Sequence, residues 1–460
     1  MLDMIGVGPF ITLPLLLSAM GGPQAMLGWV LGALLAICDG LVWAELGAAM
    51  PEAGGSYYFL RSIYSGTGGG GVLGRFIAFL FIFQLTFSAP LSVASGCIGL
   101  SQYAAFIWPS LARNPAAHMV HLGPYSAGVS VGLQTMLAIA AVVVAVLLLY
   151  RRLASLRIVA AGMWCAVMGL LGWILITGVL HGHFAQAFAF PTGAFRPTRD
   201  FFQGLASAML IATYDYWGYY NVTFLGGEVK NAARTVPRAI LISIAIVGAM
   251  YLAMTVAVLS VIPWQQLIGA QDIVARRAVI AVFMQHAYGA HLGPVLGKLA
   301  AALVMVAAFA SVFSLLLGYS RIPYAASRDG NFFRIFGRLH PKGFPHMSLL
   351  FLGAMAVCFC FFSLSDVIAG LVVIRILLQF LMQHVGVMLL RRSQPDLPRP
   401  FRLWLYPFPP LIAIAGFSYI LFARPNFGRE LLLAAAIVLL GTIAFFARNR
   451  DLRQAKMSHT

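Results

Sequence analysis

The sequence predicts an all-α integral membrane protein with twelve transmembrane helices. These form an inverted five-plus-five helix repeat, in which helices 1 and 6 are broken, plus two peripheral helices. Three observations predict this class: an extreme apolar composition, long apolar segments along the whole chain, and two interrupted segments five spans apart. Of the 460 residues, 61% are hydrophobic and only 9% are charged, whereas soluble domains carry about 25% charged residues. No soluble core could bury so much apolar surface, so lipid is the expected solvent.

The apolar segments are long enough to cross a bilayer as helices, which takes about 20 residues each. They are continuous and rich in leucine and alanine, whereas a membrane β-barrel needs short strands of alternating polarity. We expect one polytopic domain, with repeat one at about 1–180, repeat two at about 201–390, peripheral helices at 403–447 and a short tail at 448–460. The predicted spans are 3–20, 25–49, 76–107, 126–149, 155–180, 201–227, 238–262, 293–319, 346–364, 366–390, 403–423 and 430–447.

The basic residues predict the orientation. With a cytoplasmic amino terminus, the inner segments hold 21 of the 30 Lys and Arg residues and the outer segments hold 8, while Arg375 falls within a span. Cytoplasmic loops are enriched in these residues, so both termini are expected on the cytoplasmic side of the cell membrane. The same clustering explains the net charge of +17 without nucleic-acid binding. The outer loop 264–291 looks amphipathic and predicts a short helix lying on the outer face.

Two spans carry signals that interrupt a helix. Span 1 contains GVGP, from Gly6 to Pro9, where glycine lowers helix stability and proline removes a backbone donor. Span 6 contains TYDYWGYYN (213–221), where Gly218 and crowded aromatic residues mark a second break. Because five is an odd number of spans, the second unit enters the membrane from the opposite side. This is the signature of an inverted repeat whose discontinuous helices meet near the midplane.

The two breaks predict a site for a small polar solute. Free amides at the amino end of a half-helix attract an anion, and free carbonyls at a carboxyl end attract a cation, so a zwitterion satisfies both. An intramembrane carboxylate is costly, and Asp215 is therefore expected to face a cavity, a cation or a partner. It either binds a substrate amine or holds the open backbone. Tyr214, Tyr216, Trp217 and Tyr219 either form a stacking wall or pack in the protein core.

Four stretches of the chain resemble the amino acid–polyamine–organocation permease family. IGVGPFI (5–11) is similar to the glycine-rich break of helix 1. AELGAAMPEAGGSYYFLRSIYSG (44–66), the most specific of the four, is similar to the end of helix 2 and the inner loop after it. YDYWGYYNVTFLGGEVKNAARTVPRAI (214–240) is similar to helix 6 and its cytoplasmic exit. SRIPYAASRDGNFFRIFGRLHPKGFP (320–345) is similar to the loop after helix 8.

The resemblance implies ten core helices in two inverted halves plus two peripheral ones, with alternating access around a central site. It implies that the backbone of Gly6, Val7 and Gly8 receives a substrate carboxylate, and that 214–218 lines the amine and side-chain end. Pro9 stands where the family more often has a small or β-branched residue, which leaves one fewer amide. The candidate substrate-binding residues are Gly6, Val7, Gly8, Pro9, Tyr214, Asp215, Tyr216, Trp217 and Gly218.

Further residues are candidates for an inner gate. Glu45, Glu228 and Arg238 match family motif positions near the inner face. The resemblance implies that they close the gate or fix the loops there. Plain solvation at the membrane surface is the alternative interpretation.

Four residues are candidates for ion coupling. Proton-coupled relatives carry a lysine in helix 5, where Arg157 is the nearest basic residue here. Arginine does not deprotonate, so Arg157 either mimics a bound cation or snorkels to the inner surface. Asp39 is another intramembrane acid and a candidate for a proton route. Ser311 and Ser314 share a face of helix 8, where they either help to bind sodium or bond back to their own helix. Coupling to protons is favoured over coupling to sodium.

The sequence therefore predicts a secondary active transporter that moves amino acids or related organic amines across the cell membrane. A polyamine importer and an amino acid exchanger are the alternatives. A membrane-embedded enzyme would need a nucleophile–base pair or a metal cluster at membrane depth, and a nutrient sensor usually appends a signalling domain; neither feature is found in the sequence. No cofactor and no metal are expected, because two histidines in a loop, as in HGH (181–183), are more often solvated than bound to a metal.

Overall fold

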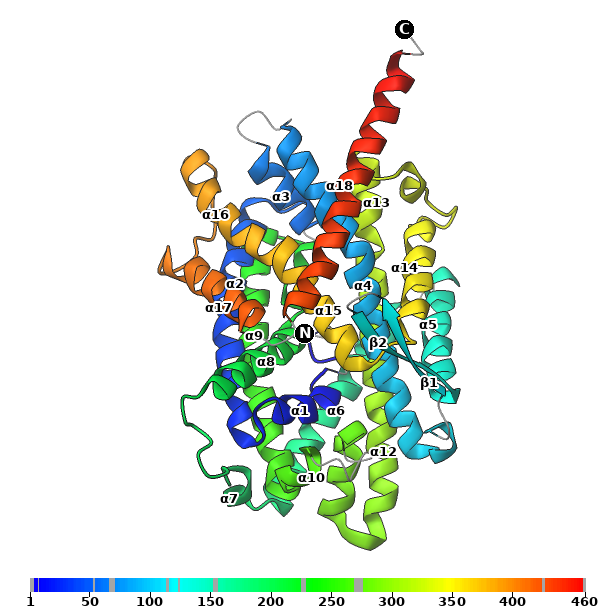
Figure 1. The fold of residues 1–460 in the computed structure, drawn as a ribbon, viewed down its shortest axis with the longest axis vertical. Coiled ribbons are helices and arrows are strands. Elements are labelled where there is room, and N and C mark those ends of the chain that lie inside the picture. The colour runs from blue at the N-terminus through cyan, green and yellow to red at the C-terminus, as the bar shows by residue number, and fades with distance from the viewer. Residues whose placement is uncertain are drawn as a thin grey trace.

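The computed structural model describes residues 4–6, 8–52, 54–65, 71–112, 116–122, 125–151, 156–224, 229–268, 276–423 and 427–457. This part of the chain is mostly helical, and its long helices run side by side (Figure 1). Within it, seven helices are long and apolar enough to cross a membrane, and four shorter helices are apolar as well. The structure thus agrees with the predicted class of all-α membrane protein.

The elements follow the predicted order of apolar segments. Those labelled η are 3-10 helices, except η6, which is a π-helix. The first half consists of α1 (Gly8–Met20), η1 (Pro23–Ala25), α2 (Met26–Ala49), α3 (Ser56–Tyr64), α4 (Val72–Ile107), η2 (Pro109–Ala112), β1 (Ala116–Leu122), β2 (Tyr125–Val131), α5 (Leu133–Arg151) and α6 (Leu156–His181). The second half consists of α7 (Phe184–Ala187), α8 (Arg199–Tyr216), η3 (Tyr219–Phe224), α9 (Ala232–Val261), α10 (Trp264–Ile268), α12 (Val279–Tyr319), α13 (Arg321–Arg328), η5 (Arg334–Gly337), α14 (His346–Phe359), α15 (Leu364–Arg375), η6 (Ile376–Phe380), α16 (Leu381–Ser393), α17 (Phe408–Phe422) and α18 (Phe427–Met457).

One group of helices is built around α2, which packs against α8 and α9, while α1 packs against α8. Small residues allow this close approach. A Cβ atom added at Gly28 would lie 2.9 Å from the Cβ of Ala208, and one added at Gly32 would lie 2.8 Å from the Cβ of Ala212. Two small residues four positions apart on each helix therefore form the contact, as is common between membrane helices. Through this contact α2 holds the end of α8 in place.

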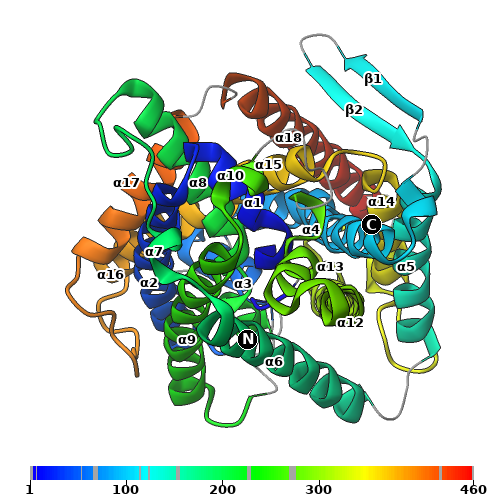
Figure 2. The same cartoon turned by 90° about the horizontal axis from the view of Figure 1, so that it is seen from below.

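A second group of helices is built around α4, which packs against α5, α12, α14, α15 and α18. Seen along the helices, α1 lies near the centre of the molecule and α4 lies beside it (Figure 2). The outward-facing side chains of α2 and α18 include exposed Val30, Leu34, Leu439 and Ile443. Exposed apolar side chains on the outer faces of helices are the arrangement expected where lipid is the solvent.

A β-hairpin departs from the predicted helical content. The segment 126–149 was predicted as one span, but strand β2 takes its first residues and α5 begins only at Leu133. β1 and β2 pair antiparallel. The backbone N–H of Ser130 donates to the carbonyl of Phe361, 2.8 Å away, which joins the hairpin to the connection between α14 and α15. The prediction failed because a short apolar run with β-branched residues fits a strand as well as the start of a helix.

The structure has a short helix, α10, in the loop 264–291 where one was predicted, but the apolar end of this loop belongs to the long helix α12. α12 begins at Val279, and residues Val279–Met284 are buried rather than lying on an outer face. Gly289 has φ +68°, a left-handed conformation that glycine adopts readily, and it kinks α12 at this point. The amphipathic pattern was real, but protein instead of the membrane surface covers its apolar side.

Candidate functional site

The first predicted break lies where α1 begins. Residues 4–6 are not helical, and regular helix starts at Gly8. Met4 and Ile5 are each only 1% exposed, so this irregular backbone is covered by protein. Val7 lies outside the described residues. The first backbone amides of α1 have no partner one turn earlier, and Pro9 removes one of these donors.

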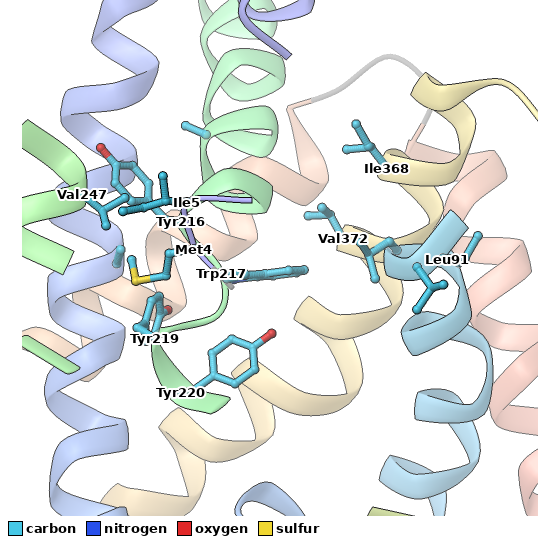
Figure 3. Close-up of a cluster of buried hydrophobic side chains, with 14 of the residues drawn as sticks. Met4, Ile5, Leu91, Tyr216, Trp217, Tyr219, Tyr220, Val247, Ile368 and Val372 are labelled. Atoms are coloured by element: carbon cyan, nitrogen blue, oxygen red, sulfur yellow. The ribbon is translucent and has the colours of Figure 1, made fainter. Parts of the chain in front are cut away.

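The second predicted break lies where α8 ends. The helix ends at Tyr216, Trp217 is extended with φ −62° and ψ 150°, and Gly218 has φ +120°, which favours glycine. A short 3-10 helix, η3, follows. In Figure 3, the ring of Trp217 extends from this break towards Val372 of α15. The break therefore turns a large aromatic side chain away from the axis of α8.

Three contacts join the two breaks. The hydroxyl of Thr12 in α1 donates to Asp215 Oδ2 at 2.5 Å. A Cβ atom added at Gly8 would lie 2.2 Å from Asp215 Oδ1, so only glycine lets the carboxylate approach α1 this closely. The hydroxyl of Tyr251 in α9 contacts the carbonyl of Met4 and lies 3.1 Å from the carbonyl of Asp215. Both breaks are thus held against each other.

Asp215 is an unusual buried acid. Its side chain is 2% exposed, and its Oδ1 atom has no hydrogen-bond partner among the described residues. A single neutral hydroxyl, that of Thr12, contacts the other oxygen. A buried carboxylate with so few partners is costly in an apolar environment. Asp215 lines the cavity described below, and its Oδ1, packed against Gly8, is left without a hydrogen bond among the described residues.

A cavity of about 50 Å³ lies between the two breaks and the group of helices around α4. This volume is smaller than that of most small-molecule sites, so an amino acid has to widen the cavity when it binds. The lining comes from both breaks and from α4, α12 and α15. Its members are Met4, Gly6, Gly8, Ser92, Gly96, Tyr214, Asp215, Trp217, Gly218, Tyr220, Ser311, Leu315, Tyr319, Leu371 and Arg375.

The predicted aromatic residues divide into two sets. Tyr214 and Trp217 line the cavity; the hydroxyl of Tyr214 lies 2.8 Å from Ser95 Oγ, and Trp217 stacks on Phe380. Tyr216 points away from the cavity, because its hydroxyl donates to the carbonyl of Trp29 in α2 at 3.1 Å. Tyr216 is therefore a packing residue, and Pro9, within the first turn of α1, is likewise buried in the core.

Arg375 was not among the predicted site residues, although it was noted inside a span. It is 2% exposed and lines the cavity at the end of α15. Its partners are neutral: it donates to Tyr220 Oη at 2.9 Å, Ser92 Oγ at 3.1 Å and Ser88 Oγ at 3.3 Å. The only sequence signal was a charge inside an apolar segment, which is a functional-site indicator by itself.

The ion-coupling candidates lie in different places. Asp39 does not line the cavity; it accepts a hydrogen bond from the Tyr219 hydroxyl and lies 3.1 Å from His384 Nε2. Both side chains of the Asp39–His384 pair are fully buried. Ser311 lines the cavity, whereas Ser314 is half-buried and is not part of the lining. The side chain of Arg157 lies outside the described residues.

The three candidates for the inner gate differ in their surroundings. Glu45 is 1% exposed. It forms a bidentate salt bridge with Arg391, which donates from Nε to Oε1 at 2.9 Å and from Nη2 to Oε2 at 2.5 Å. It also accepts from the backbone N–H of Leu403 at 2.8 Å and lies 3.5 Å from Arg399. Glu45 thus fixes α2, α16 and the segment before α17 to one another. Arg238 is exposed on α9, and Glu228 lies outside the described residues.

A helix that starts at Gly8 after irregular backbone and a helix that ends at Tyr216 before Gly218 meet at a cavity inside a bundle of apolar helices, as expected for secondary transporters with discontinuous helices. Comparison with known proteins specifies the class further. A family model described as amino acid permease matches residues 1–443, and the chain belongs to this family. It is a multi-pass membrane transporter and not an enzyme.

Curated relatives span nearly the whole chain. The branched-chain amino acid permease BcaP of Bacillus subtilis is 26% identical, over 98% of this chain and 92% of the relative. The serine/threonine exchanger SteT of the same organism is 23% identical, over 91% of this chain and 86% of the relative. The mouse protein solute carrier family 7 member 12 is 25% identical, over 87% of this chain and 79% of the relative.

Proposed function

We propose that this chain moves an amino acid across the cell membrane by alternating access at the cavity between α1 and α8. The proposal includes twelve spans in an inverted repeat, with both termini in the cytoplasm. The observation that carries it is the contact between the two breaks, where the start of α1 faces the free oxygen of Asp215. Exposed amides and an unpaired carboxylate, side by side, suit the two charged groups of an amino acid.

In this proposal each end of the substrate has its own receptor. The ammonium group binds the free Oδ1 of Asp215, because an opposite charge offsets the cost of burying that oxygen. The carboxylate binds the backbone at the start of α1, around Gly6 and Gly8, which line the same cavity. Tyr214 and Trp217 form part of the wall around the rest of the substrate.

The polyamine alternative is weaker for an electrostatic reason. A polyamine carries several positive charges and no carboxylate, and the cavity already contains the permanent charge of Arg375. Like charges repel strongly where the effective dielectric constant is low. The printed names of the relatives, which are permeases or exchangers of amino acids in two cases, also favour amino acids.

We further propose proton coupling, with the Asp39–His384 pair on the proton route. A carboxyl group and an imidazole, both fully buried and 3.1 Å apart, can exchange a proton in a site closed to bulk water. The pair is linked to the substrate site through Tyr219, which directly follows the break at Gly218. Sodium coupling has weaker support, because only one of the two predicted serines lines the cavity.

Transport by the purified protein in liposomes tests the proposal. Labelled amino acids and polyamines are offered with an inward proton gradient, an inward sodium gradient, or neither. We expect uptake of at least one amino acid, stimulated by the proton gradient, and no uptake of polyamines. Accumulation that requires amino acid preloaded inside the liposomes would indicate an exchanger. Polyamine uptake without any amino acid uptake would refute the assignment.

A further inference from the structure

The cavity contains a second buried charge that the binding of a simple zwitterion does not use. Arg375 stands at the end of α15, directly before the π-helical turn η6. Its guanidinium is surrounded by α4, η3 and α12, which contribute Ser88, Ser92, Tyr220 and Tyr319. π-helical turns inside helices occur frequently at functional sites.

No carboxylate pairs with this guanidinium within the described part of the chain. Its hydrogen-bond acceptors are hydroxyl groups and one carbonyl, and its charge lies over two aromatic rings, with the centroid of Trp217 at 5.5 Å and that of Tyr319 at 5.2 Å. These contacts engage most of the N–H groups but do not neutralise the charge. Because an arginine cannot release its proton, only an anion that enters the cavity can neutralise this positive charge.

The cavity therefore contains two opposite charges, those of Asp215 and Arg375, and together they restrict the kind of amino acid that fits. Asp215 lies at the α1 side and Arg375 on α15, and both line the same space. The start of α1 and Asp215 accommodate one carboxylate and one ammonium group, as proposed above. Arg375 is then left to bind a third group of the substrate. That group has to accept hydrogen bonds and carry a negative charge. The guanidinium fork matches a carboxylate in geometry and in charge.

We propose that Arg375 binds a second carboxylate, so that the preferred substrates are amino acids with an acidic side chain. This inference rests on the proposed function as an amino acid transporter. The aromatic rings of Trp217 and Tyr319 hold the guanidinium in place, and Ser92 and Tyr220 orient its N–H groups. The acidic side chain of the substrate then reaches across the cavity from the α1 side to α15.

The matched pairs glutamate with glutamine and aspartate with asparagine test this inference. Each pair has nearly the same shape and differs in one charge. Binding is measured as thermal stabilisation of the purified protein, and transport as competition with uptake of a labelled amino acid. For the parent protein we expect each acid to bind at least tenfold more tightly than its amide, because a site built around a charged group rejects the neutral analogue.

Substitution of Arg375 then separates substrate recognition from a purely structural role. In Arg375→Gln we expect the preference for the acid to vanish, so that glutamate and glutamine differ by less than twofold. Arg375→Lys keeps the charge but loses the fork, so it should retain part of the preference. The matched control is Arg392→Gln, an exposed position on the following helix α16, which should keep the parent ratio.

The outcomes distinguish the two proposals. If no amino acid is bound or transported, the proposed function itself is wrong. If amino acids are transported but the parent protein binds the amides as tightly as the acids, the assignment of Arg375 to a second carboxylate is overturned while the transport function stands. The same holds if Arg375→Lys lowers the affinity for glutamate and glutamine by equal factors. The comparison of acids with amides on the parent protein does not depend on whether Arg375→Gln folds.

Discussion

Two regions of this molecule bury charged side chains among apolar helices, and they do so in opposite ways. Around Glu45, the carboxylate has two cationic neighbours, Arg391 and Arg399, and a backbone N–H donor. Around the cavity, Asp215 and Arg375 have only neutral partners among the described residues. The burial is similar: Glu45 is 1% exposed, and Asp215 and Arg375 are each 2% exposed.

The difference separates charges that hold the fold from charges that await a ligand. A paired buried charge is expensive to separate from its partner, so the pair fixes the elements that carry it. An unpaired buried charge destabilises the empty protein and is tolerated where it faces a cavity. Substitutions in the first region should therefore change stability, and substitutions in the second should change transport.

The largest effect on transport is expected for Asp215→Asn. The amide keeps the shape and one acceptor for Thr12, but it loses the charge that binds the substrate ammonium group. We expect uptake to fall by at least about 100-fold, equivalent to about 2.7 kcal/mol of lost interaction. Initial rates in liposomes, normalised to folded protein, measure the effect. Normal uptake by this variant would contradict the division between the two regions.

The converse is expected for Glu45→Gln. Two arginine side chains lose their shared carboxylate, and breaking a buried pair costs about 3–5 kcal/mol. Since the Arg391 side chain is 20% exposed, the low end of that range applies here. The melting temperature in detergent should fall clearly, while the ratio of glutamate to glutamine binding stays unchanged. A variant with unaltered stability and lost transport would show that Glu45 acts as a gate instead.

A smaller effect is expected when the two breaks are forced apart. Gly8→Ala places a methyl group 2.2 Å from Asp215 Oδ1, so one of the two must shift. Overpacking costs about 1–3 kcal/mol, and we expect substrate to bind about tenfold more weakly. The matched control is Gly370→Ala in α15, where the added Cβ would meet no atom within 4 Å. Titration of the thermal stabilisation by substrate measures both, and equal affinities would disprove the close contact.

The smallest effect on binding is expected for Asp39→Asn. The amide still accepts a hydrogen bond from Tyr219, so substrate affinity should change by less than about fivefold, equivalent to one hydrogen bond of about 1 kcal/mol. The stimulation of uptake by an inward proton gradient should be lost, because the group can no longer take up a proton. Uptake with and without the gradient measures this, and undiminished stimulation would remove Asp39 from the proton route.

Local chemistry made much of the fold predictable. Long apolar segments predict membrane helices, and glycine and proline predict where they open, so the start of α1 at Gly8 and the end of α8 just before Gly218 agree with the expectations. The β-hairpin was missed because its short apolar run fits either secondary structure. The twelve spans and the inverted repeat stay predictions.

The site was less predictable because its partners are distant in sequence. Asp215 and Gly8 carried local signals. Arg375 has hydrogen-bond partners 155 and 283 residues away, at Tyr220 and Ser92. No spacing rule connects such positions, so packing alone brings them together. The reverse holds for Tyr216, whose neighbours in sequence line the cavity while its own hydroxyl turns to α2.

The hydroxyl of Tyr251 lies against two carbonyl groups, those of Met4 and Asp215, one from each broken helix. A phenol carries a single hydrogen atom, so it can complete only one of these two bonds well at any instant. At any instant, the other of these two carbonyl oxygens therefore receives no hydrogen bond from Tyr251. Met4 lines the cavity, so we expect a protonated amine or a water molecule there to donate to its carbonyl while the tyrosine turns to that of Asp215.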